Sequence, residues 1–186
     1  MIKILVVDVG FVLSNFLNIT FLSTPVEHKH ASNVVLAFSQ EINPSFKGKI
    51  NWDICGQSKN LTTEILVSCL KKGLDYDYVL IPYNGSVGHY EEEKKALENL
   101  LNKGVFVVIS SGNVLVDLRT ISPQRYCLGK PRCLVVSDLD TPSSPQIAGL
   151  TVNVSGKICR YLFFCETGSS YAAPKVLARL INELHR

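Results

Sequence analysis

Four short runs of apolar residues divide the sequence, and none of them alternates with polar positions. Runs rich in Val, Ile and Leu without alternation are typical of strands that are buried on both faces of a sheet. They occupy residues 2–7, 78–81, 105–109 and 134–136. The pattern therefore predicts a central sheet with a covering layer on each side.

Between these runs, three segments repeat their apolar residues at helical spacing: residues 31–38, 62–70 and 91–101. The third begins with glutamates and is followed by Lys103 and Gly104, which are typical helix-end signals. This alternation of strands and helices indicates a parallel sheet with helices on both faces. Residues 151–164 resemble a β-hairpin turning at Ser155 and Gly156, and a final helix is expected over residues 170–184. The predicted fold is α/β, a three-layer αβα sandwich with a mostly parallel sheet and a β-hairpin before the C-terminal helix.

Length and charge narrow the class of protein. With 186 residues, 46% of them hydrophobic, the chain is predicted to form one domain over residues 1–186. The formal net charge is +3 and the charges are scattered, so no nucleic-acid partner is expected. The apolar runs are far shorter than the roughly 20 residues of a membrane helix, so no membrane partner is expected either.

The start of the chain and its cysteines suggest a compartment. Asp8 interrupts the opening apolar run after residues 4–7, so no signal peptide is predicted and the expected location is cytoplasmic. The six cysteines are then expected to be reduced thiols. Their spacing is not that of a zinc site, and no metal or cofactor is predicted.

Candidate chemistry is expected where the strands end, since ligands of open α/β sheets bind beyond the carboxyl ends of the strands. Asp8 ends the first strand, and His30 and Ser170 each open a predicted helix. A carboxylate, an imidazole and a hydroxyl are the parts that make a serine nucleophilic. Each of these residues alone also has a plain structural role, such as capping a helix.

The local sequence around these residues resembles the subtilisin-like serine proteases. Residues 168–174 read G-S-S-Y-A-A-P, similar to the family's G-T-S-M-A-A/S-P, and residues 4–10 read I-L-V-V-D-V-G, similar to its aspartate strand. Residues 30–34, H-A-S-N-V, more loosely resemble its H-G-T-H-V helix, and residues 110–113, S-S-G-N, resemble its A-A-G-N segment. The order Asp, His, Asn, Ser is that of subtilases. The resemblance spans nearly the whole chain.

The resemblance implies a role for each site residue. It makes Ser170 the nucleophile, His30 the general base and acid, and Asp8 the carboxylate that orients the histidine, with Asn113 and the Ser170 amide as the oxyanion hole. It also implies that substrate backbone lies along two segments. The residues expected to bind substrate are Pro82, Tyr83, Asn84, Gly85, Ser110, Ser111 and Gly112.

The sequence departs from the family pattern at four positions: Ala31 for Gly, Asn33 for His, Ser169 for Thr and Tyr171 for Met. None of these changes removes a catalytic group. His28 offers a second imidazole two residues before His30, so the position of the base remains to be tested.

The expected activity is that of a compact serine endopeptidase without a propeptide, acting through an acyl-enzyme on a narrow intracellular protein or peptide substrate. The sequence leaves room for a protein partner that completes or regulates the site. Two alternatives are a catalytically inactive subtilase-like module and a receiver-like regulatory module, because residues 3–8 also resemble the start of a receiver domain. A receiver would carry acids where this chain has Val7, Val9, Pro82 and Tyr83.

Overall fold

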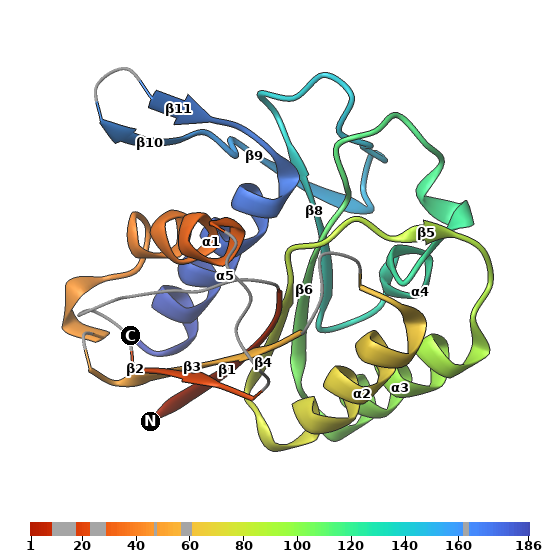
Figure 1. The fold of residues 1–186 in the computed structure, drawn as a ribbon, viewed down its shortest axis with the longest axis horizontal. Coiled ribbons are helices and arrows are strands. Elements are labelled where there is room, and N and C mark those ends of the chain that lie inside the picture. Colours follow the sequence, from red (N-terminus) through yellow and green to blue (C-terminus); the bar gives the residue numbers. More distant parts are fainter. Residues whose placement is uncertain (9–17, 23–28, 47, 57–60, 162–163) are drawn as a thin grey trace.

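Seven parallel strands form the central sheet in the computed structural model of the protein (Figure 1), which describes residues 1–8, 18–22, 29–46, 48–56, 61–161 and 164–186. The strands lie in the order β2-β3-β1-β4-β6-β8-β9, and each neighbouring pair is parallel. Their bounds are β1 Ile2–Val7, β2 Asn18–Phe21, β3 Ile50–Cys55, β4 Tyr78–Ile81, β6 Phe106–Ser110, β8 Cys133–Asp138 and β9 Thr151–Val154.

The strand β1 shows why the apolar runs do not alternate with polar residues. Its successive side chains point to opposite faces of the sheet. Ile4 and Val6 belong to the apolar cluster on one face, and Leu5 and Val7 belong to the cluster on the other. Because β1 is covered on both sides from Ile4 to Val7, each of these positions is apolar, as predicted.

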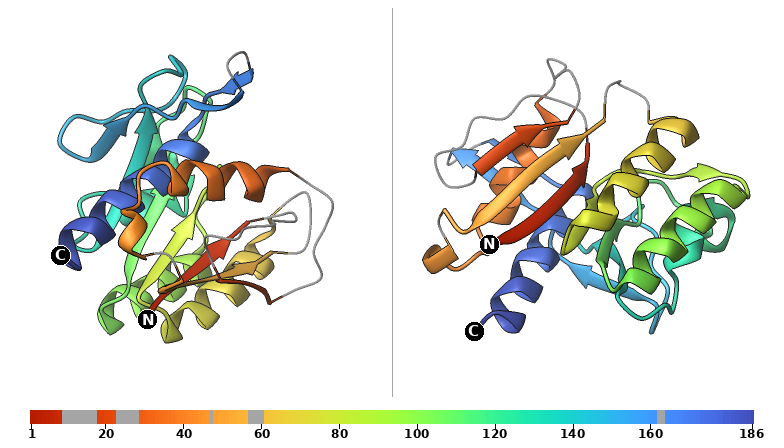
Figure 2. Two further views of the ribbon diagram at one scale, coloured as in Figure 1. Left: turned by 90° about the vertical axis from the view of Figure 1, so that its left-hand side faces the viewer. Right: turned by 90° about the horizontal axis from the view of Figure 1, so that it is seen from below.

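Two pairs of helices supply the covering layers (Figures 1 and 2). Helices α1 (His30–Ser39) and α5 (Ser169–Leu184) pack together on one face of the sheet, and α2 (Thr63–Lys72) and α3 (Glu91–Lys103) pack together on the other. Helix α3 ends as predicted, with Gly104 in the left-handed conformation at a φ of 91°. The three-layer α/β sandwich is confirmed.

Short elements connect these layers. Their bounds are η1 Pro44–Phe46, η2 Gly73–Asp75, β5 Ser86–Val87, η3 Leu118–Thr120, β7 Ile121–Ser122, α4 Gln124–Cys127, β10 Ile158–Tyr161 and β11 Phe164–Glu166. In the part of the chain that the structure describes, no helix has both the length and the apolarity to cross a membrane.

The predicted hairpin over residues 151–164 was wrong in its pairing. Strand β9 does not pair with β10; it runs parallel to β8 and forms the edge of the main sheet. Val152 and Val154 on β9 pack against the core under α5, which explains why this arm joins the sheet. A hairpin does precede α5, but it consists of β10 and β11.

The prediction of reduced cysteines was also wrong, because the structure pairs all six. Cys55 at the end of β3 joins Cys69 on α2, Cys127 joins Cys133, and Cys159 joins Cys165 across the β10–β11 hairpin. Their Cα atoms lie 5.8, 5.2 and 4.1 Å apart. Since disulfides persist mainly in oxidising compartments, the cysteines no longer support a cytoplasmic location.

Removing the bridge between β3 and α2 is expected to lower stability. The bridge closes a loop of 14 residues, so the Cys55→Ala/Cys69→Ala variant should lose about 3 kcal/mol of unfolding free energy in denaturant titrations without reductant. The same comparison in reductant is the control, since it leaves only the packing change. Detection of six free thiols in denatured, unreduced wild-type protein would contradict the pairing.

Candidate active site

The carboxyl end of the sheet carries a carboxylate bonded to a histidine. Asp8 follows β1 and is buried, and its backbone N–H donates to the Cys55 carbonyl 3.1 Å away. Its Oδ1 lies 2.7 Å from Nδ1 of His30, the first residue of α1. In the neutral ring the proton then resides on Nδ1, and Nε2 is the basic atom.

Gly56 makes room for the backbone of Asp8, and sequence reasoning missed it. A Cβ atom at Gly56 would lie only 2.3 Å from the Asp8 carbonyl oxygen, so a larger residue would displace the backbone that carries Asp8. The only local signal is a glycine directly after a strand, which is common in loops.

The surroundings of His30 favour its protonated form. Burial of the ring lowers its pKa, but the hydrogen bond to Asp8 and the negative charges of Asp8 and Glu166 raise it more, so the pKa lies above its ordinary value. This is the electrostatic setting that a general base needs, because the imidazolium formed during catalysis is stabilised.

The helix α5 places Ser170 in its first turn. Ser170 is buried there, with only 7% of the residue exposed. The N–H groups of Tyr171 and Ala172 donate to the Gly168 carbonyl, which starts the helix. The amino end of a 16-residue helix carries partial positive charge and N–H groups without intrahelical partners, both favourable to a developing oxyanion.

Asn113 is fixed against the same turn. Its Oδ1 accepts hydrogen bonds from the Ser169 N–H and hydroxyl, at 2.8 and 3.1 Å, and the Gly112 N–H donates to that hydroxyl at 3.0 Å. With Oδ1 so engaged, the Nδ2 group is the part of Asn113 that can donate. It lies beside Gly168, where a Cβ would stand 3.2 Å from it.

A ring contact connects the two halves of the site. The rings of His30 and Tyr171 have their centroids 5.8 Å apart, and Tyr171 directly follows Ser170. The structure thus brings Asp8 to His30 and Asn113 to the turn of Ser170, with Tyr171 between the two groups.

The predicted substrate segments lie beyond β4 and β6, but several of their polar groups are used internally. The Tyr83 carbonyl accepts from the Ser110 hydroxyl at 3.0 Å, and the Ser111 hydroxyl lies 3.0 Å from that of Ser144. Ser110 and Ser111 are buried. Their hydroxyls are therefore engaged with partners within the protein.

Gln124 on α4 joins the two segments and had no sequence signal. It is buried, and its Nε2 donates to the carbonyls of Tyr83 and Ser110, at 3.1 and 3.0 Å. Gly85 packs directly against this side chain, where a Cβ would lie 2.0 Å from the Gln124 amide oxygen. These contacts fix the spacing between the carboxyl ends of β4 and β6.

Asn84 and Gly112 face one another across that spacing. Pro82 is buried, whereas Asn84 is exposed, and its Oδ1 lies 3.4 Å from where a Cβ on Gly112 would stand. The Asn84 side chain thus lies in the space between the two segments.

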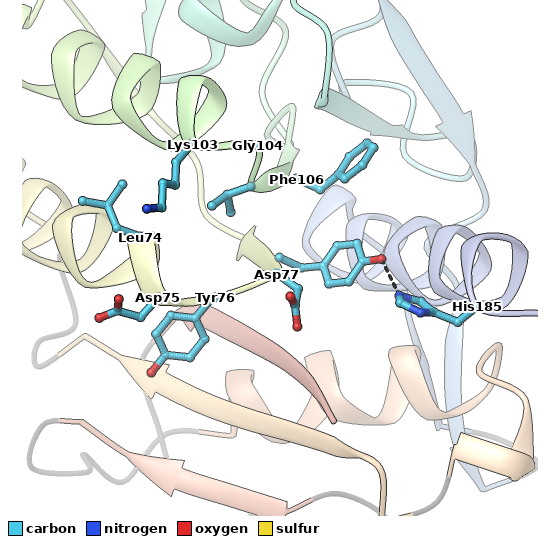
Figure 3. A pocket seen from close by; sticks show the side chains of 10 residues that line it. Leu74, Asp75, Tyr76, Asp77, Lys103, Gly104, Phe106 and His185 are labelled. Carbon is cyan, nitrogen blue, oxygen red and sulfur yellow. Dashed lines mark hydrogen bonds between the residues drawn. The ribbon is translucent and has the colours of Figure 1, made fainter.

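A separate pocket of about 430 Å³ lies at the opposite, amino end of the strands (Figure 3). In this pocket Tyr78 Oη and His185 Nε2 lie 3.0 Å apart. Because this pocket lies at the amino ends of the strands and the candidate site at their carboxyl ends, the pocket is not part of the candidate site. The described residues contain no group of three side chains placed to hold a metal ion.

Several solved structures have a similar fold. The chain is similar to the prenylagaramide maturation protease PagA, with a TM-score of 0.70 and 15% identity over 99% of this chain and 76% of that one. A cold-adapted subtilisin-like serine proteinase matches with a TM-score of 0.70 and 17% identity, over 98% and 76% of the two chains. The nisin leader peptidase NisP from Lactococcus lactis matches with a TM-score of 0.68 and 14% identity, over 100% of this chain and 78% of that one. The chain has a subtilisin-like fold.

No protein-family model matches the sequence, and no curated protein matches it either. The five central strands, β3-β1-β4-β6-β8, have the order 2-1-3-4-5 that receivers also use. The sheet differs from that of a receiver by the strands β2 and β9, which extend it at its two edges. These structural neighbours are a maturation protease, a subtilisin-like serine proteinase and a leader peptidase.

Proposed function

We propose that the chain is a serine endopeptidase in which Ser170 is the nucleophile, His30 the general base and acid, and Asp8 the orienting carboxylate. The observation that carries the proposal is the 2.7 Å contact between Asp8 and His30, beside the first turn of the helix that bears Ser170. The subtilisin-like fold of its protease neighbours supports the same reaction class.

The reaction follows from these positions. His30 Nε2 takes the proton of Ser170 as Oγ attacks the scissile carbonyl, and Asp8 stabilises the resulting imidazolium. The negative charge on the carbonyl oxygen is met by the amide of Asn113 and the N–H of Ser170. His30 then gives its proton to the leaving amine, and water releases the acyl group by the same steps in reverse.

The substrate is proposed to be a dedicated protein or peptide precursor that lies extended between residues 82–85 and 110–112. The narrow approach of Asn84 to Gly112 supports selection of small residues there. One structural neighbour is named a maturation protease and another a leader peptidase. Both names describe the processing of such a precursor. No cofactor is needed for this chemistry.

Labelling with a fluorophosphonate tests the proposal. The probe should modify Ser170, located by peptide mapping, and Ser170→Ala should not be labelled and should hydrolyse no peptide. Ser68→Ala, at an exposed position on α2, is the matched control and should label like wild type. Intact labelling of Ser170→Ala would disprove the assignment.

The pH dependence of hydrolysis gives a further expectation. The base must be neutral, and the pKa of His30 is raised above 6.5, so kcat/KM should rise with pH through a midpoint above 6.5. A profile of kcat/KM against pH measures this. A midpoint below 6.5 would contradict the described setting of His30.

A further inference from the structure

A glutamate outside the proposed triad lies at the centre of a hydrogen-bond network next to His30. Glu166 ends β11, and its Oε2 accepts from Asn33 Nδ2 at 2.8 Å and from the Tyr171 hydroxyl at 3.0 Å. Asn33 Nδ2 also lies 3.2 Å from the Tyr171 hydroxyl, so each of the three groups contacts the other two. They come from three elements, α1, β11 and α5.

Tyr171 connects this network to the histidine. Its ring lies 5.8 Å from that of His30, centroid to centroid, and its hydroxyl is bonded to the carboxylate. Burial raises the pKa of Tyr171; the Asn33 hydrogen bond lowers it, but Glu166 and Asp8 raise it further. The hydroxyl therefore keeps its proton and acts as a donor to Glu166.

Asn33 and Tyr171 are two of the four residues that depart from the subtilase pattern. Where the pattern has His and Met, this chain has an amide and a phenol, and both donate to the same carboxylate. Neither donor would be needed there without Glu166. The three residues are thus interdependent.

We propose that Glu166 is a positioning residue for His30: held by Asn33 and Tyr171, it is a second carboxylate that, with Asp8, stabilises the imidazolium and fixes the ring. This inference rests on the proposed peptidase function. Glu166 does not touch the reacting atoms, and its effect reaches the reaction through His30.

The charges around His30 set the direction of the effect. Among the described residues, Asp8 faces the ring from the end of β1, Glu166 from β11 and the neutral Tyr171 from α5. Lys29, directly before α1, has its Nζ 3.2 Å from Glu166 Oε1, but its side chain is 71% exposed and its charge is screened by water. Two carboxylates and one solvated ammonium leave a net negative field, so removing Glu166 should lower the pKa of His30.

Glu166→Gln is the decisive variant because the amide oxygen can still accept from Asn33 and Tyr171 while the charge is gone. We expect kcat to fall roughly fivefold with KM unchanged. The acid limb of the kcat/KM profile, and the titration of His30 followed by NMR, should both move to lower pH. Glu166→Asp, which keeps the charge, should move the His30 titration less than Glu166→Gln does.

Glu41→Gln is the matched control. Glu41 lies just after the other end of α1, where its carboxylate pairs with Arg179 at 3.0 Å, so the variant removes one negative charge from the same face of the sheet. It should leave kcat and the His30 titration unchanged. Equal shifts in both variants, or no shift in Glu166→Gln, would overturn the proposal.

Two further readouts keep the result decisive. If Glu166→Gln does not fold, Tyr171→Phe takes its place, because it removes only the hydroxyl that links the ring to Glu166; unchanged kcat in that variant would overturn the proposal.

The His30 titration needs no activity, so it tests the network even if Ser170 does not react with a fluorophosphonate. Failure of labelling refutes the peptidase function, whereas an unmoved His30 titration refutes the role of Glu166.

Discussion

The His30→Ala variant should lose about 10⁶-fold in kcat, since a serine hydroxyl without its base is a poor nucleophile and the members of a triad act as a unit. The leaving amine also loses its proton donor. The His30 side chain is partly exposed, and His30 is the first residue of α1, so the fold should tolerate the change. Hydrolysis of a peptide ester and the rate of fluorophosphonate labelling both measure the loss.

Two histidine variants serve as controls for this loss. His89→Ala changes an exposed imidazole that pairs with Glu91 at 3.5 Å, and should keep full activity. His28→Ala should also be tolerated; His28 lies outside the described residues, and it was the alternative base in the sequence. Loss of turnover in His28→Ala with retention in His30→Ala would reassign the base.

The Asn113→Ala variant should lower kcat by a factor on the order of 10² to 10³, since it removes one oxyanion donor. KM should change little, because the donor is used most strongly when the charge develops. Asn113→Asp is the sharper variant. It keeps the oxygen that accepts from Ser169, at 2.8 and 3.1 Å, but puts a carboxylate where the amide donor was.

Comparison of these two variants separates the roles of Asn113. If it acts on the oxyanion, Asn113→Asp should be at least as inactive as Asn113→Ala although it retains the contacts to Ser169. If Asn113 only holds the turn, Asn113→Asp should be active and Asn113→Ala should lower the midpoint of thermal unfolding along with activity.

The strands that were predicted best are those buried on both faces. In β4 every position is buried and apolar, and in β1 only the exposed Lys3 departs from this, so the pattern is nearly continuous and easy to find. Strand β3 was missed because Asn51 and Asp53 interrupt its apolar residues. Asp53 is tolerated there because the Tyr76 hydroxyl donates to it at 2.7 Å, a partner 23 positions away that no local pattern reveals.

The same limit applies to the site. Asp8, His30, Asn113 and Ser170 became candidates because each stands in a short stretch that resembles a known motif. Gln124 and Glu166 stand in no such stretch, and their roles come from contacts with residues 41 and 133 positions away. Cysteine pairing was unpredictable for the same reason, since it depends on which residues the fold brings together.

The three disulfides share a simple connectivity: first with second, third with fourth, and fifth with sixth along the chain. Among the many pairings that six cysteines allow, this is the sequential one. The loops span 14, 6 and 6 residues, so neither of the first two bridges requires the segment that follows it. In oxidising surroundings the bridges can therefore form in chain order, from the first pair to the last. The last bridge closes on Cys165, five residues before Ser170, so all three covalent cross-links precede the proposed nucleophile along the chain.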